Sequence, residues 1–147
     1  MPPIGRSSAI TGVADEPVAS GFVRWIVDAM NVIGTRPDGW WKDRRAAAVR
    51  LVDRLERWAS AEGQRVTVVF ERPPSPPIRS TVIEVGHAPA AAANSGDDEI
   101  IRLVAAEDRP QQLTVVTSDA ILADRARRAG ANVYPAAPFR NLIDPRD

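Results

Sequence analysis

The sequence of 147 residues has no cysteine, a single histidine and no long apolar run. Disulfides and thiolate metal sites are therefore excluded, and we expect a protein suited to a reducing cytoplasm. No segment approaches the roughly 18 apolar residues that a membrane span needs, and residues 1–21 lack the apolar stretch of a secretory signal. We predict that residues 1–21 form a flexible tail. The net charge is zero, so any contact with nucleic acid requires a local basic patch.

Apolar periodicity predicts an alternation of strands and helices. Strands are expected over 22–27, 65–70, 81–85, 113–117 and 131–135, and helices over 43–62, 97–107 and 118–130. Asp43 and Gly63 are expected to cap the first helix. Residues 72–80 contain four prolines and are predicted to be an exposed loop, and residues 139–144 a terminal turn. This order predicts an α/β domain whose mostly parallel sheet is covered by helices on both faces.

Acidic residues recur where this architecture would bring them together. They follow strands or open helices, and in a parallel sheet these positions lie along one edge: Asp28, Glu71, Asp97, Asp98 and Asp119. Asp97, Asp98 and Asp119 have a simpler interpretation as helix caps, and Asn31 as a turn residue. Asp28 is harder to explain in this way, because no helix is predicted until well after it.

A cluster of carboxylates at one edge favours a metal site. Converging carboxylates repel one another, which raises their pKa values unless a cation joins them. Mg²⁺ and Mn²⁺ both accept a ligand set made of oxygen atoms. Such an ion would also bridge the acidic cleft to a phosphate.

Four motifs together resemble the NYN domain of the PIN-like ribonuclease superfamily, most closely its YacP-like branch. The motifs are VDAMNVIG, VTVVFE, SGDDEIIRLV and VVTSDAILADRARRAGA. The resemblance implies a PIN-like domain over 22–147, with a three-layer α/β/α fold and a cleft that binds Mg²⁺ or Mn²⁺ and cleaves RNA. It implies catalytic roles for Asp28, Asn31, Asp97 and Asp119, and metal binding by Asp28, Asp97, Asp98 and Asp119. Ala29 and Glu71 depart from the family pattern, which usually has Gly and often Asp there.

Basic and aromatic residues lie between the first strand and its helix, beside the expected acidic edge. Cations bind phosphates, and indole rings stack on unpaired bases. We therefore expect RNA binding by Arg36, Trp40, Trp41, Lys42, Arg44 and Arg45. The alternative is that one of the two tryptophans packs against the helix and that the charged side chains form an ordinary solvated face.

The leading hypothesis is a metal-dependent endoribonuclease acting on single-stranded or ribosome-associated RNA. One alternative is a catalytically weak or inactive PIN-like module that binds RNA or the ribosome. A receiver domain or a phosphatase of the haloacid-dehalogenase type fits poorly. The phosphatase pattern needs an aspartate two residues after the first, where this chain has Met30, and a receiver needs an acidic pair at the first strand end.

Overall fold

The computed structural model describes residues 24–89 and 94–146, so the tail predicted over 1–21 lies outside the described residues. Its centre is a five-stranded sheet with the order β3-β2-β1-β4-β5, in which every neighbouring pair is parallel. The strands are β1 Arg24–Asp28, β2 Arg65–Phe70, β3 Glu84–His87, β4 Leu113–Val116 and β5 Asn132–Tyr134. The predicted parallel α/β fold is confirmed, and β3 begins three residues later than expected.

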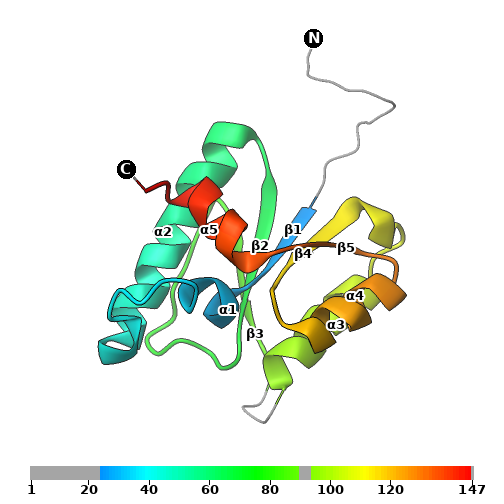
Figure 1. Cartoon of the computed structure of the whole chain (residues 1–147), viewed down its shortest axis with the longest axis horizontal. Helices are drawn as coiled ribbons and strands as arrows, with labels where there is room; N and C mark the ends of the chain where they lie inside the picture. Colours follow the sequence, from blue (N-terminus) through cyan, green and yellow to red (C-terminus); the bar gives the residue numbers. More distant parts are fainter. Residues whose placement is uncertain (1–23, 90–93, 147) are drawn as a thin grey trace.

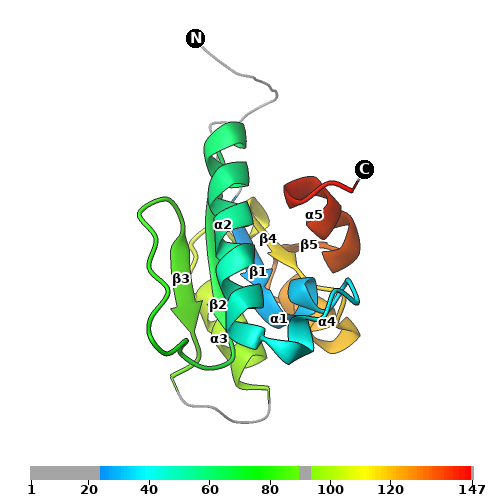
Figure 2. The same cartoon turned by 90° about the vertical axis from the view of Figure 1, so that its left-hand side faces the viewer.

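Helices cover both faces of this sheet (Figures 1 and 2). They are α1 Ala29–Ile33, α2 Arg44–Glu62, α3 Ser95–Ala105, α4 Ala120–Arg128 and α5 Ala136–Ile143, with short 3₁₀ turns at η1 Trp40–Lys42 and η2 Pro110–Gln112. One face packs on α1, α2 and α5, and the other on α3 and α4. In the described part of the chain, no helix is long and apolar enough to cross a membrane.

The two faces follow from the alternation of side chains along the strands. Val27, Val68 and Val116 face α1, α2 and α5, and each is fully buried. Their chain neighbours Ile26 and Val69 point the other way, toward α3 and α4. Adjacent strand residues point to opposite faces, so a sheet covered twice needs apolar side chains at nearly every position. The continuous apolar runs in the sequence have this origin.

Helix α2 forms as the sequence predicts. The Asp43 side chain accepts a hydrogen bond from the Ala46 backbone nitrogen at 2.9 Å and so caps the first turn. Gly63 ends the helix in the left-handed conformation, with φ of 65°. Both capping predictions are confirmed.

Two expectations about helices are wrong. Helix α1 begins directly after Asp28, where no helix was expected, and its Ala29, Val32 and Ile33 are buried against the core. The segment predicted as a terminal turn belongs to α5, which buries Ala136, Phe139 and Ile143. Both helices are too short to show a clear period and are held by burial of their apolar faces.

Candidate active site

Asp28 ends β1 at the carboxyl edge of the sheet, in register with Val69 of β2. The Thr117 hydroxyl donates to its carboxylate at 3.1 Å. Burial raises the pKa of Asp28 from 3.8 to about 6, and the charges of Asp97 and Asp119 add to the rise. The Thr117 hydroxyl and the Asn31 backbone N–H oppose it. Asp28 is thus a half-buried carboxyl group whose neighbours include two further acids.

Asn31 lies on α1 and connects that helix to the loop after β4. Its Oδ1 accepts a hydrogen bond from the Ser118 backbone nitrogen at 2.7 Å. The Ser118 hydroxyl in turn accepts from the backbone nitrogen of Ala136 at 2.9 Å. Since Oδ1 is engaged inside the protein, any contact with substrate would fall to the amide nitrogen of Asn31.

Asp119 occupies the N-cap position of α4. Its carboxylate accepts from the Leu122 backbone nitrogen at 2.9 Å, as the helix-cap interpretation predicts. Its own backbone nitrogen donates to the Thr117 hydroxyl at 3.1 Å. The Thr117 side chain therefore connects Asp28 with the residue that begins α4.

Asp97 and Asp98 lie in the first turn of α3. Burial raises the pKa of Asp97, and the charges of Asp119, Asp98 and Glu71 raise it further, while Arg125 lowers it. Asp98 is exposed and forms an ion pair with Arg125 at 3.0 Å. Acids from β1, α3 and the start of α4 therefore act on one another electrostatically, as expected for a shared edge.

Glu71 adjoins this group without being buried. It follows β2, and its backbone and side chain lie against Gly96, where an added Cβ would stand 3.2 Å from the Glu71 Cγ. Glycine at position 96 lets α3 begin close to the end of β2, which brings Asp97 beside Glu71.

The donor set fits a hard divalent cation, because it consists of carboxylate oxygens with Asp28 held partly away from water. Within residues 24–89 and 94–146, however, no three acidic or histidine side chains are close enough to hold a metal ion as they stand. The carboxylates of Asp98 and Asp119 are engaged by Arg125 and by the Leu122 backbone, respectively. Joint metal binding by three of these residues would require their carboxylates to move closer together.

Three further residues, to which no role is assigned above, shape the site. Thr117 is 1% exposed and bonds to both Asp28 and Asp119, Ser118 holds Asn31, and Arg125 pairs with Asp98. Two hydroxyl residues directly before a capping aspartate are a visible signal in the sequence. Arg125 gives none, because its partner lies 27 residues away on another helix.

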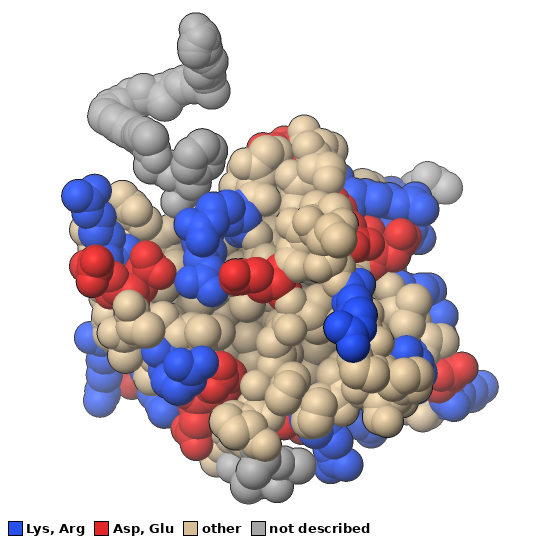
Figure 3. Space-filling view, turned by 180° about the vertical axis from the view of Figure 1, so that it is seen from behind, with Lys and Arg blue, Asp and Glu red and all other residues tan. Residues whose placement is uncertain are grey.

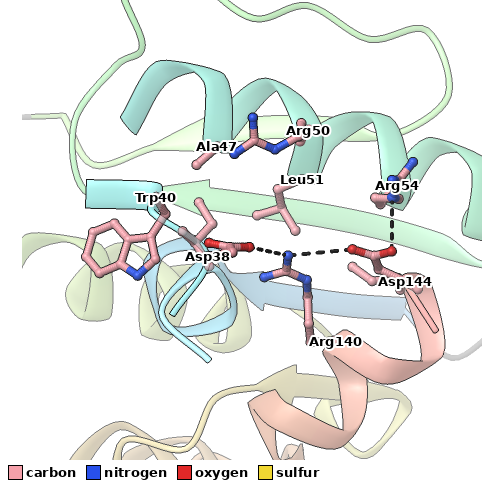
Figure 4. A pocket seen from close by; sticks show the side chains of 10 residues that line it. Asp38, Trp40, Ala47, Arg50, Leu51, Arg54, Arg140 and Asp144 are labelled. Atoms are coloured by element: carbon pink, nitrogen blue, oxygen red, sulfur yellow. Dashed lines mark hydrogen bonds and ion pairs between the residues drawn. The ribbon is translucent and has the colours of Figure 1, made fainter. Parts of the chain in front are cut away.

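Arg36 is not part of an open RNA surface. Its side chain is 11% exposed, and it bonds to Asp144 and to the Asn141 side chain. Asp144 also pairs with Arg54 and Arg140, in a network around a cavity of about 30 Å³ (Figure 4). The guanidinium of Arg36 thus fixes α5 to the loop after α1, and RNA binding by Arg36 stays a prediction that would compete with these contacts.

The other predicted RNA-binding residues lie at η1 and the start of α2. Trp40 is half-buried and packs on the core, whereas Trp41 is 51% exposed and stands edge-on to it. The Arg44 guanidinium lies 5.2 Å from the Trp40 ring centroid, and Lys42 and Arg45 are exposed. On the face seen from behind the view of Figure 1, acidic and basic side chains are interspersed (Figure 3).

The all-parallel sheet, covered by helices on both faces and carrying acids at its carboxyl edge, is the arrangement that the PIN-like resemblance implies. The chain belongs to the family of the YacP-like NYN domain, whose model matches residues 25–146. Its fold is similar to the crystal structure of Rae1 (YacP) from Bacillus subtilis, with a TM-score of 0.64, 25% identity, and coverage of 80% of this chain and 72% of that one. The crystal structure of the W164L mutant of the same protein is similar with a TM-score of 0.67 and 24% identity. This match covers 82% of this chain and 76% of that one. A comparison with curated proteins gave no match.

Proposed function

We propose that the chain is an endoribonuclease that hydrolyses RNA phosphodiester bonds with the help of Mg²⁺ or Mn²⁺. The observation that supports the proposal is the electrostatic effect that Asp28, Asp97 and Asp119 have on one another at the carboxyl edge of the sheet. Helix capping explains Asp119 by itself, but it does not explain why the half-buried Asp28 is affected by the charges of two other carboxyl groups.

In this proposal Asp28, Asp97 and Asp119 hold the cation, which when bound activates water and offsets negative charge on the scissile phosphate. Thr117 holds the Asp28 carboxylate in place through its hydroxyl. The Asn31 amide nitrogen is available to orient a phosphate oxygen, since Ser118 fixes the other end of the amide. Asp98 is paired with Arg125, and we assign it a supporting role in place of direct metal binding.

The test is a cleavage assay on end-labelled single-stranded and structured RNA, with Mg²⁺, Mn²⁺ or EDTA. We expect cleavage only with a metal ion, and products that carry a 5′ phosphate because water is the attacking group. Asp97→Asn should abolish cleavage. Asp124→Asn is the matched control, because Asp124 is an exposed α4 residue paired with Arg128. Cleavage in EDTA, or full activity of Asp97→Asn, would refute the proposal.

A non-catalytic module that binds RNA or the ribosome is the second candidate. It is favoured by the finding that, in the described residues, no three acids stand close enough to hold a metal ion. The zero net charge is also compatible with a partner, such as the ribosome, that delivers the RNA. This candidate predicts RNA binding that survives Asp28→Asn, together with no cleavage by the unmodified protein at any metal concentration.

A further inference from the structure

A cavity of about 450 Å³ opens between the start of α2 and the loop that follows β2. Met30, Phe70 and Ile78 supply apolar side chains to it. Phe70 belongs to the buried core, and Met30 and Ile78 pack against that core from the rim. This volume is in the range of pockets that hold small organic groups. The apolar part of the cavity, formed by Met30, Phe70 and Ile78 and called the seat below, is large enough for a planar ring.

Arginines surround this seat. Arg44, Arg45 and Arg72 line the cavity, and Glu71 is the acid among the lining residues, so the lining carries net positive charge. Arg45 donates a hydrogen bond to the Pro76 carbonyl and thereby fastens the loop after β2 to α2. An apolar seat with a cationic rim matches a group that is flat and apolar at one end and anionic at the other.

The cavity adjoins the candidate active site. Val69 of β2 pairs with Asp28, and Phe70 and Glu71 are the next two residues along that chain. Met30 lies two residues after Asp28, on α1. Glu71 lines the cavity, and its side chain also lies against Gly96, the residue before Asp97. The cavity therefore lies at the end of β2, next to the acids of the candidate active site.

We propose that this cavity binds one unpaired nucleobase of the RNA, with the neighbouring phosphates on Arg44 and Arg72. The inference rests on the proposed function in taking RNA as the ligand. A base can enter an apolar cavity only when it is unpaired and turned out of its stack, so the site selects single-stranded segments. The exposed Trp41 offers a second stacking surface in η1, just before the start of α2.

The test measures binding by fluorescence anisotropy in EDTA, using a short labelled single-stranded RNA and an abasic strand of equal length. We expect the complete RNA to bind at least fivefold more tightly, which is the lower end for one base contact. A second measurement uses the same RNA with photoreactive bases, with cross-links mapped by mass spectrometry. Cross-links are expected at Met30 or within residues 70–78.

Two variants test the apolar seat and the arginines at the rim of the cavity separately. Ile78→Gln makes the seat polar and should reduce the advantage of complete RNA over abasic RNA. Arg72→Gln should weaken binding of both RNAs and lower its salt dependence. Arg65→Gln removes the same charge from the opposite, amino-terminal edge of the sheet and should change neither property.

The anisotropy and cross-linking measurements on the unmodified protein test the proposed base-binding site even when a variant fails to fold. Equal affinity for complete and abasic RNA, an absence of measurable binding, or cross-links confined to Trp40 and Trp41 would each overturn the proposal. Because no metal ion is present, a failure of catalysis leaves this result unaffected. A protein that binds bases at the cavity and never cleaves RNA would refute the proposed function alone.

Discussion

Replacing Asp28 by asparagine should stabilise the metal-free protein at neutral pH. The pKa of Asp28 is 3.8 ordinarily and about 6 in the folded protein, mainly because the group is buried. Between these two values the folded protein retains a proton that the unfolded chain releases. The free energy of unfolding therefore falls as the pH rises through this window, and the loss is complete above about pH 7.

The size of the effect follows from the same two values. A shift from 3.8 to about 6 is close to two units, and each unit corresponds to about 1.4 kcal/mol, so the loss reaches about 3 kcal/mol. Asparagine has no charge to lose and keeps an oxygen that accepts the Thr117 hydrogen bond. For a chain of this size, the expected gain in Tm at pH 7 is on the order of 6–12 °C.

The assay is urea unfolding of both proteins in EDTA from pH 4 to pH 8. The free-energy difference should be near zero at pH 4 and grow to its full size by pH 7, with the variant more stable. Groups such as Glu99, whose ion pair with Arg102 lowers its pKa, are present in both proteins. Their contributions to the pH dependence of the unfolding free energy therefore cancel in the difference between the two proteins. A difference that is constant with pH, or that favours the unmodified protein, would refute the reasoning.

Three further predictions follow from the site and its surroundings. Mn²⁺ at pH 7.5 should raise the Tm of the unmodified protein and leave that of Asp28→Asn nearly unchanged, as measured by thermal melts. Thr117→Val should cost about 1–3 kcal/mol in urea unfolding, because the Asp119 backbone N–H loses its acceptor, whereas Thr117→Ser should restore both stability and cleavage. Trp41→Ala should weaken RNA binding by about 1–3 kcal/mol at unchanged Tm, while Trp40→Ala should lower the Tm, because only Trp40 packs on the core.

The parts of the fold that were predictable carry their signal within one stretch of chain. Helix α2 has 19 residues, a repeating apolar face and a capping residue at each end, so local pattern and tertiary packing agree. Helix α5 has 8 residues and contains Pro138, so its local pattern does not indicate a helix. Pro138 lies in the first turn of the helix, where the absent N–H has no partner to lose.

Some features of the candidate site were likewise predictable from the sequence and others were not. The alternation of strands and helices predicts that Asp28, Asp97 and Asp119 lie along one edge, because parallel strands end together. The role of Arg36 was not predictable, since its partner Asp144 lies 108 residues away and no local pattern connects them. The orientation of Asn31 toward Ser118 depends likewise on a contact between distant segments.

Helix α1 also explains the departure at Ala29. A glycine would be required there if the chain left Asp28 through a left-handed turn. The chain enters a right-handed helix instead, and Asn94 is the non-glycine residue with positive φ among those described. The Ala29 methyl group is fully buried in the core. Alanine thus suits the turn that carries Asn31 to Ser118, and its presence gives no argument against catalysis at Asp28.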